Sequence, residues 1–153
     1  MGPATQNQLP RGKEADGIIG DFIMRNNLIE AVIAHSAHLQ KANMTTNWEG
    51  VTPRCLYELA LKGSNNDQIT VFAPSMQKGP VSYVRVIDDG SNGNAVVATV
   101  VSAKMNKGLF KRHDYHLQDD WQGLYVITTL YNKSPNSIIL ETGDYITNLP
   151  PKT

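Results

Sequence analysis

The sequence predicts an α+β fold in which N-terminal helices pack on an antiparallel β-meander of about five strands. The spacing of the apolar residues changes from about 3.6 to 2 near residue 68, which favours helices before that point and strands after it. Turn-forming segments separate the later apolar runs by a few residues, and such short connections join antiparallel strands. With 153 residues, of which 41% are hydrophobic, the chain suits one domain with its own core.

Residues 17–40 are predicted to form the first helical region. Ile18, Phe22 and Ile29 belong to a series of apolar residues spaced near 3.6, which is typical of one face of a helix. The polar stretch 25–27 interrupts this series. The region therefore forms either one helix with an exposed turn or two shorter helices.

A second helix is predicted over residues 52–63. Thr52 is a suitable N-cap, and Pro53 follows it at the first helical position, where a missing N–H leaves no hydrogen bond unmade. Leu56 begins an apolar face, and Gly63 is a suitable residue to end the helix in a left-handed conformation.

The rest of the chain is rich in Val, Ile, Thr and Tyr and predicts strands. The predicted strands are 68–73, 80–87, 94–103, 123–131 and 137–142, with turns at 88–94 and 133–136. The strand 94–103 is apolar on both faces, so it should lie at the centre of the sheet, with helix on one side. The predicted core consists of Ile33, Leu56, Leu59, Val84, Val97, Val100, Val126, Ile127 and Ile139.

The ends of the chain and its cysteine content bear on domain organisation and compartment. Residues 1–16 have almost no large apolar side chain and are predicted to be a flexible tail or linker, with the domain over residues 17–153. No signal peptide or membrane-spanning run is recognisable. The single cysteine, Cys55, excludes an intramolecular disulfide and mildly favours a cytoplasmic location, unless an upstream leader or anchor is missing.

The four histidines form two pairs, His35/His38 and His113/His116, each spaced by three residues. Imidazoles at this spacing share a helix face and can bind zinc, copper or nickel. The H-E-x-x-H arrangement of a zinc helix is absent from the sequence. We therefore predict no metal and no cofactor, and the two pairs remain open as metal ligands.

The segment 111–121 has the highest density of chemically capable side chains. His113 and His116 lie beside Asp114 and Asp119, and a histidine next to carboxylates can act as a general base. An alternative function is therefore a small hydrolase or nuclease-like enzyme built on these four residues. In that case their side chains should converge in one pocket.

A weaker alternative is association with nucleic acid through residues 104–112. Lys104, Lys107, Lys111 and Arg112 surround Phe110 here, and basic residues around an aromatic ring can contact phosphates and stack on a base. The formal net charge of zero, from 14 basic and 14 acidic residues, argues against a nucleic-acid partner.

The preferred prediction is a non-enzymatic protein-binding or assembly module: a subunit, an adaptor, an inhibitor, or the soluble domain of a larger surface or secretion assembly. The absence of a catalytic signature and the balanced charge favour it. Aromatic residues often anchor interfaces, and the candidate binding residues are Trp48, Phe110, Tyr115 and Trp121. The partner would be another protein or a second copy, bound near residues 115–121, with Trp48 or an edge strand contributing.

Overall fold

The chain folds into nine β-strands arranged in two antiparallel sheets. The structure is a computed structural model that describes residues 8–10, 17–35, 55–64, 69–77 and 80–148. Within these ranges there is no α-helix, and the helical conformation is confined to short segments such as the 3-10 turn η2 (Pro74–Met76). The prediction of an α+β fold with N-terminal helices is therefore wrong, and the architecture is all-β.

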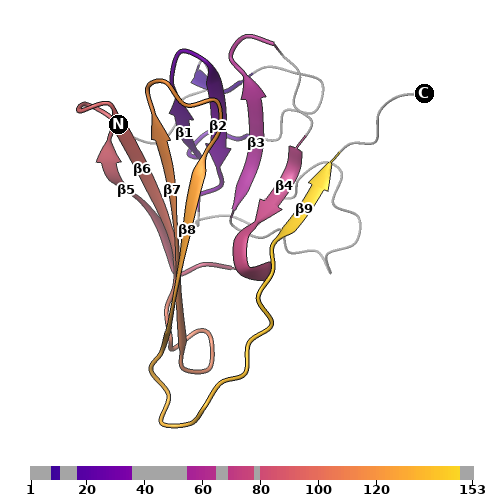
Figure 1. The fold of residues 1–153 in the computed structure, drawn as a ribbon, viewed down its shortest axis with the longest axis vertical. Helices are drawn as coiled ribbons and strands as arrows, with labels where there is room; N and C mark the ends of the chain where they lie inside the picture. The colour runs from indigo at the N-terminus through magenta and orange to yellow at the C-terminus, as the bar shows by residue number, and fades with distance from the viewer. Residues whose placement is uncertain (1–7, 11–16, 36–54, 65–68, 78–79, 149–153) are drawn as a thin grey trace.

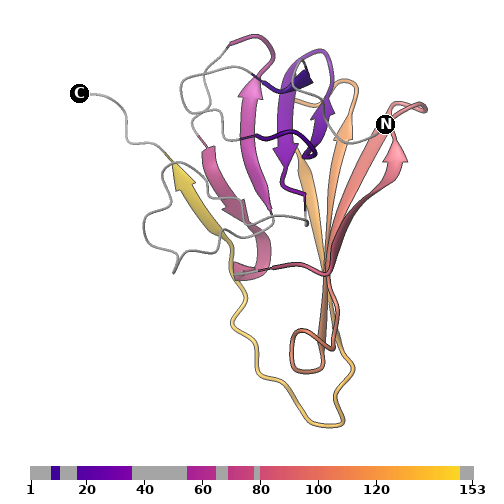
Figure 2. The same cartoon turned by 180° about the vertical axis from the view of Figure 1, so that it is seen from behind.

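The two sheets face each other as two layers (Figure 1; Figure 2 shows them from behind). The first sheet has the strand order β1-β2-β3-β4-β9, and the second has the order β5-β6-β7-β8. The strands are β1 (Phe22–Arg25), β2 (Ile29–Ile33), β3 (Leu56–Leu61), β4 (Ile69–Ala73), β5 (Tyr83–Asp89), β6 (Asn94–Val101), β7 (Leu109–Gln118), β8 (Tyr125–Asn132) and β9 (Tyr145–Asn148). The main core cluster contains buried residues from both sheets, including Met24 and Ile33 from the first and Val97 and Tyr115 from the second.

The first predicted helix is replaced by the hairpin of β1 and β2. Residues 26–28 form its turn, in which Asn26 accepts hydrogen bonds through Oδ1 from the backbone N–H groups of Leu28 and Ile29, both at 2.8 Å. A turn inside an apolar series gives spacings that imitate a helix, although each strand alternates with period two. Residues 36–40 lie outside the described part of the chain.

The second predicted helix is also wrong, because Leu56–Leu61 forms β3 and pairs antiparallel with β2. Thr52 and Pro53 fall outside the described residues. Gly63 does end the element with a positive φ of 73°, but it ends a strand in a turn and not a helix. The glycine therefore predicted correctly where the element ends, but it did not distinguish a strand from a helix.

Four of the five predicted strands correspond to β4, β5, β6 and β8, and the turn over 88–94 is confirmed. The fifth is wrong, because residues 137–142 belong to no strand, and β9 begins at Tyr145. The ten-residue strand β7 was not predicted. Its inward and outward residues alternate as in any strand. Residues 111–114 are charged or polar on both faces, however, so the alternation does not appear as an alternation of apolar and polar residues in the sequence.

Most of the predicted core is buried, with β6 at the centre of its sheet as expected. Ile33, Leu56, Val84, Val97 and Val100 are buried, and Leu59 and Val126 are half-buried. The prediction was wrong for Ile127 and Ile139, which are 41% and 98% exposed. Ile127 projects from the outer face of an edge strand, and Ile139 lies in the loop between β8 and β9. In the described residues, no helix is long and apolar enough to cross a membrane.

Candidate functional site

His113 lies in the interior of the molecule, on the inward face of β7. Its side chain is 1% exposed; Nε2 lies 2.8 Å from Oγ of Ser75 and Nδ1 lies 3.2 Å from Oγ1 of Thr99. Burial, followed by the nearby positive charge of Lys111, lowers the pKa of the imidazole to about 4. His113 is therefore neutral at pH 7.

Ser75 occupies a left-handed backbone conformation in η2, with φ 50° and ψ 37°. Its backbone N–H donates to Oδ1 of Asp144 at 2.8 Å, and its carbonyl accepts a hydrogen bond from Nζ of Lys111 at 3.2 Å. These contacts join η2 and the residue before β9 to β7. They connect one sheet to the other at the end of the sandwich that carries η2.

A neutral imidazole beside a hydroxyl can accept its proton, so Ser75 and His113 have the spacing of a nucleophile and its base. In a Ser-His-Asp arrangement a carboxylate stabilises the imidazolium that forms. Here the uncharged Thr99 occupies that position, and Asp144 is bonded to the backbone of Ser75. The arrangement therefore suits a structural cross-link between the sheets better than acyl transfer.

The four candidate catalytic residues do not converge. His113 and His116 are three residues apart on a strand, so they project from opposite faces. His116 packs near Tyr125, with 6.4 Å between ring centroids, and Asp114 forms an ion pair with Arg112, with Nη2 2.7 Å from Oδ1. Asp119 is exposed beyond the end of β7.

The histidines do not form a metal centre in the described residues, where no cluster of three or more His, Cys, Asp or Glu side chains could hold an ion. His35 follows β2, and its backbone N–H donates to Oδ1 of Asp21 at 2.8 Å. His38 lies outside the described ranges. Cys55 is buried, as expected for a cysteine that behaves as a small apolar residue.

The candidate binding residues occupy different environments. Tyr115 is fully buried in the core, and burial raises the pKa of its hydroxyl. Trp121 is half-buried, packs against the core cluster and meets Tyr125 edge-on at 6.4 Å. Phe110 is half-buried, with Nζ of Lys133 5.5 Å from its ring centre, and Trp48 lies outside the described residues.

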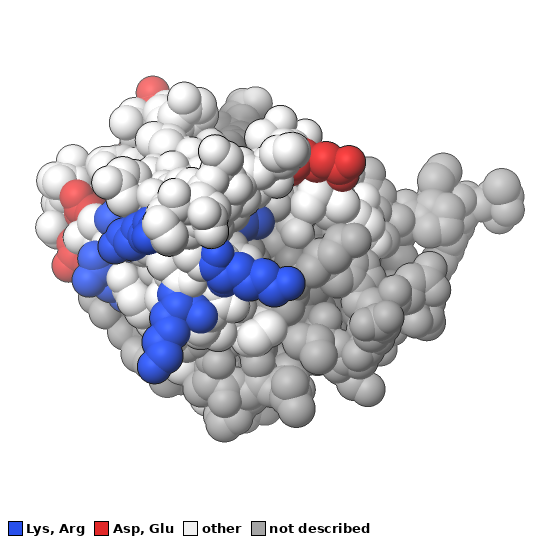
Figure 3. Space-filling model, turned by 90° about the horizontal axis from the view of Figure 1, so that it is seen from below, with Lys and Arg blue, Asp and Glu red and all other residues white. Residues whose placement is uncertain are grey.

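Basic residues gather at the lower end of the molecule. Figure 3 shows this end, where Lys and Arg side chains lie close together and acidic side chains lie towards the margin of the view. Lys104 and Lys107 in the β6–β7 connection are exposed, as is Lys133 after β8. Lys133 lies against this connection, because its N–H donates to the carbonyl of Gly108 at 2.8 Å. The predicted basic segment is thus part of a local positive surface.

The free side of β8 is an edge of the second sheet. This strand is the last of its sheet, and within the described chain no strand pairs with its outer side. Its eight residues, with the sequence YVITTLYN, carry no charge. Tyr125, Ile127 and Tyr131 project from the outer face of the sheet with 60%, 41% and 61% of their surface exposed.

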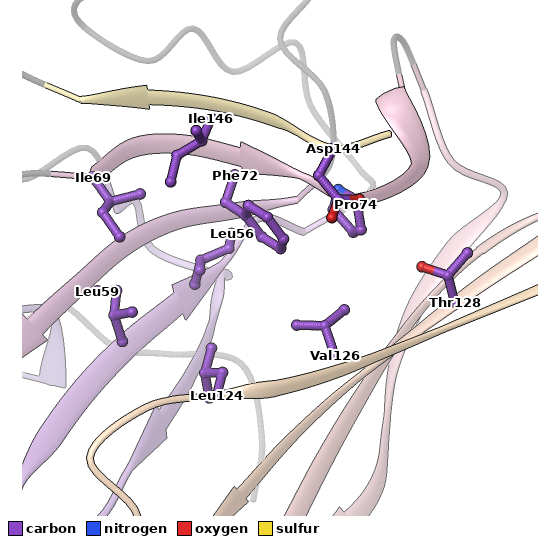
Figure 4. Close-up of a pocket in the computed structure, with 10 residues that line it drawn as sticks. All are labelled: Leu56, Leu59, Ile69, Phe72, Pro74, Leu124, Val126, Thr128, Asp144 and Ile146. Atoms are coloured by element: carbon purple, nitrogen blue, oxygen red, sulfur yellow. The ribbon is translucent and has the colours of Figure 1, made fainter. Parts of the chain in front are cut away.

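A pocket of about 310 Å³ lies beneath β8, between the two sheets (Figure 4). Leu124, just before β8, and Val126 and Thr128 of β8 line one side. The opposite side is formed by Leu56, Leu59, Ile69, Phe72, Pro74, Asp144 and Ile146. The pocket is therefore largely apolar, with Asp144 and Thr128 as its polar residues. Strand β8 thus has apolar groups on both faces as well as an unpaired edge.

An edge strand was predicted from the sequence as a docking surface, but β8 was not identified as that strand. Two features mark β8 as an open edge: it has no charge over residues 125–132, and it is the last strand of its sheet. The first feature can be read from the sequence. The second cannot, because it requires that residues 137–142 do not pair with β8, and their apolar composition predicts a strand. Comparison of the chain with protein-family models, curated proteins and solved structures gives no match.

Proposed function

We propose that this chain is a protein-binding module that accepts an extended strand of a partner along the free side of β8. The observation that carries the proposal is an eight-residue edge strand without charge, exposed on its outer face and bordered by an apolar pocket on its inner face. This function belongs to the protein-binding class that the sequence favours.

An unpaired edge presents N–H and C=O groups that can bond to another strand, and native proteins usually block such edges with charge, proline, bulges or shortness. None of these devices occurs in β8, which has eight uncharged residues without proline and pairs with β7 in continuous register. The backbone of a bound strand would supply hydrogen bonds, as in other complexes formed by strand addition.

The two faces of β8 define what such a strand should carry. Its side chains alternate in direction, so one set would meet Tyr125, Ile127 and Tyr131, and the other would reach the pocket beside Val126 and Leu124. Both surfaces are mainly apolar, with Thr129 on the outer face and Thr128 and Asp144 at the pocket. A partner strand with apolar residues on both faces therefore fits better than one that alternates apolar and charged residues.

The hydrolase alternative has less support. His113 is buried, its histidine partner in the sequence projects to the opposite face, and the residue at Nδ1 is an uncharged threonine. Nucleic-acid association through residues 104–112 stays a prediction. Its support is the positive surface around Lys104 and Lys107.

The proposal is tested by capturing partners from the native source and measuring hydrogen exchange in the purified complex. We expect amides of 125–132 to become protected on binding, while those of β5 keep their exchange rates. Tyr131→Lys places a charge on β8 and should abolish capture, whereas the matched Tyr83→Lys on β5 should not. Protection confined to residues 104–112 or 115–121 would contradict strand addition at β8.

A further inference from the structure

The loop between β8 and β9 contains an unpaired segment with the composition of a strand. Residues 137–142 have the sequence SIILET, and Ile139 is 98% exposed. Leu140 beside it is 39% exposed, so this part of the loop presents apolar surface to solvent. Within the described chain, residues 137–143 make no backbone hydrogen bond to other parts of the molecule.

This segment cannot lie along β8 of its own chain while both of its ends keep their contacts. At one end, the carbonyl of Asn136 accepts a hydrogen bond from Nδ2 of Asn132 at 2.8 Å. At the other end, Asp144 bonds to the backbone of Ser75, and Tyr145 pairs with Ala73 in the opposite sheet. Residues 137–143 must therefore cross from one sheet to the other, and they do so in a loop beyond the strand ends (Figures 1 and 2).

We propose that the segment Ser137–Thr142 of one molecule pairs with β8 of a second copy, and that the two copies exchange segments reciprocally. The inference rests on the proposed function and names its partner. Each molecule carries both an unpaired acceptor strand and an unpaired donor segment, so a two-fold arrangement satisfies both at once.

The donor and the acceptor are complementary. In an extended conformation Ile138 and Leu140 project to one side and Ile139 to the other, so the segment offers apolar groups to both faces of β8. The only charge in the segment is Glu141. The formal net charge of the chain is zero, so long-range repulsion does not oppose association of two copies.

The proposal is tested by sedimentation equilibrium of the full chain over a wide concentration range. We expect a monomer–dimer equilibrium whose dissociation constant rises at least about tenfold in Ile139→Lys. This residue is almost fully exposed, so the change leaves monomer packing intact. The matched control is Leu61→Lys, at a 65% exposed position at the end of β3, which should dimerise like the unaltered chain.

Mixing two defective variants tests the pairing of donor with acceptor. Ile139→Lys retains a good acceptor and Ile127→Lys retains a good donor, so their mixture should form a heterodimer more tightly than either forms a homodimer. A chain that stays monomeric at every concentration, or dimerises equally well as Ile139→Lys, would overturn self-pairing. In the monomeric case, protection of 125–132 by a captured partner would show that strand addition itself still holds.

Discussion

The two edges of the second sheet, β5 and β8, differ in nearly every feature that controls pairing. Strand β5 carries Arg85, Asp88 and Asp89, and its register shifts between Val86 and Asp88. The Arg85 guanidinium also covers the ring of Tyr83, 5.5 Å from its centre. Strand β8 has no charge and no register shift. One edge of this sheet is thus charged and irregular and the other is uncharged and regular, and this difference is the basis of the proposed pairing at β8.

The edges of the first sheet extend the comparison. Strands β1 and β9 have four residues each, half the length of β8. Arg25 at the end of β1 also forms an ion pair with Glu30, with 3.0 Å between Nε and Oε1. Short and charged edges make poor templates for another strand. Among the described edges, β8 is therefore the one suited to accept a partner.

We expect the largest effect from a change in β6, which lies between β5 and β7 in the second sheet. Val100→Asp places a carboxylate at a position that is 2% exposed. An unpaired buried charge costs several kcal/mol, against a free energy of unfolding of roughly 5–15 kcal/mol, so we expect the fold to be lost. Circular dichroism should show no cooperative melt. An unchanged melting temperature would contradict the assignment of β6 to the core.

Acid should act next most strongly, through His113 on the β7–β8 side of the sheet. Its pKa of about 4 in the folded chain lies below the ordinary value of 6.5, so between these values the unfolded chain binds the extra proton. The free energy of unfolding should therefore fall as the pH drops from about 6.5 to 4, by roughly 3 kcal/mol. Urea unfolding at a series of pH values measures this. The variant His113→Gln should lose that part of the pH dependence.

A smaller effect is expected from Gly108→Ala, which alters the contact between the β6–β7 connection and the chain after β8. Gly108 has φ +93°, and an added Cβ would lie 2.6 Å from Cβ of Ser134. We expect a loss of about 1–3 kcal/mol in the free energy of unfolding. Gly20→Ala is the matched control, because Gly20 has φ +105° with open space around it. Equal losses in both variants would mean that backbone strain alone is responsible.

Much of the second sheet could be predicted from sequence, because β6 is apolar throughout and the Gly-rich turn before it is unambiguous. The first sheet could not. In the β1–β2 hairpin, the three-residue turn 26–28 places Phe22, Ile29 and Ile33 at helical spacings. Strand β7 was not predicted, because one of its inward positions is occupied by the polar residue His113. Hydrogen bonds to Ser75 and Thr99 allow this side chain to be buried.

Less of the candidate site than of the fold could be predicted from the sequence. The catalytic hypothesis placed His113 and His116 together, but once β7 is a strand the two project to opposite faces. The open edge depends on which strand is last in its sheet. That depends in turn on the path of residues 137–144 towards β9, which is set by long-range contacts such as Asp144 with Ser75.

The most direct test of the difference between the two edges uses Ile87 of β5 and Ile127 of β8, which are 42% and 41% exposed. Lysine at either exposed position should change the free energy of unfolding by less than about 0.5 kcal/mol. Sedimentation equilibrium then compares Ile87→Lys with Ile127→Lys. We expect Ile127→Lys to weaken dimerisation at least about tenfold and Ile87→Lys to leave it unchanged. Equal effects in the two variants, or a loss in Ile87→Lys alone, would contradict pairing of two copies along β8.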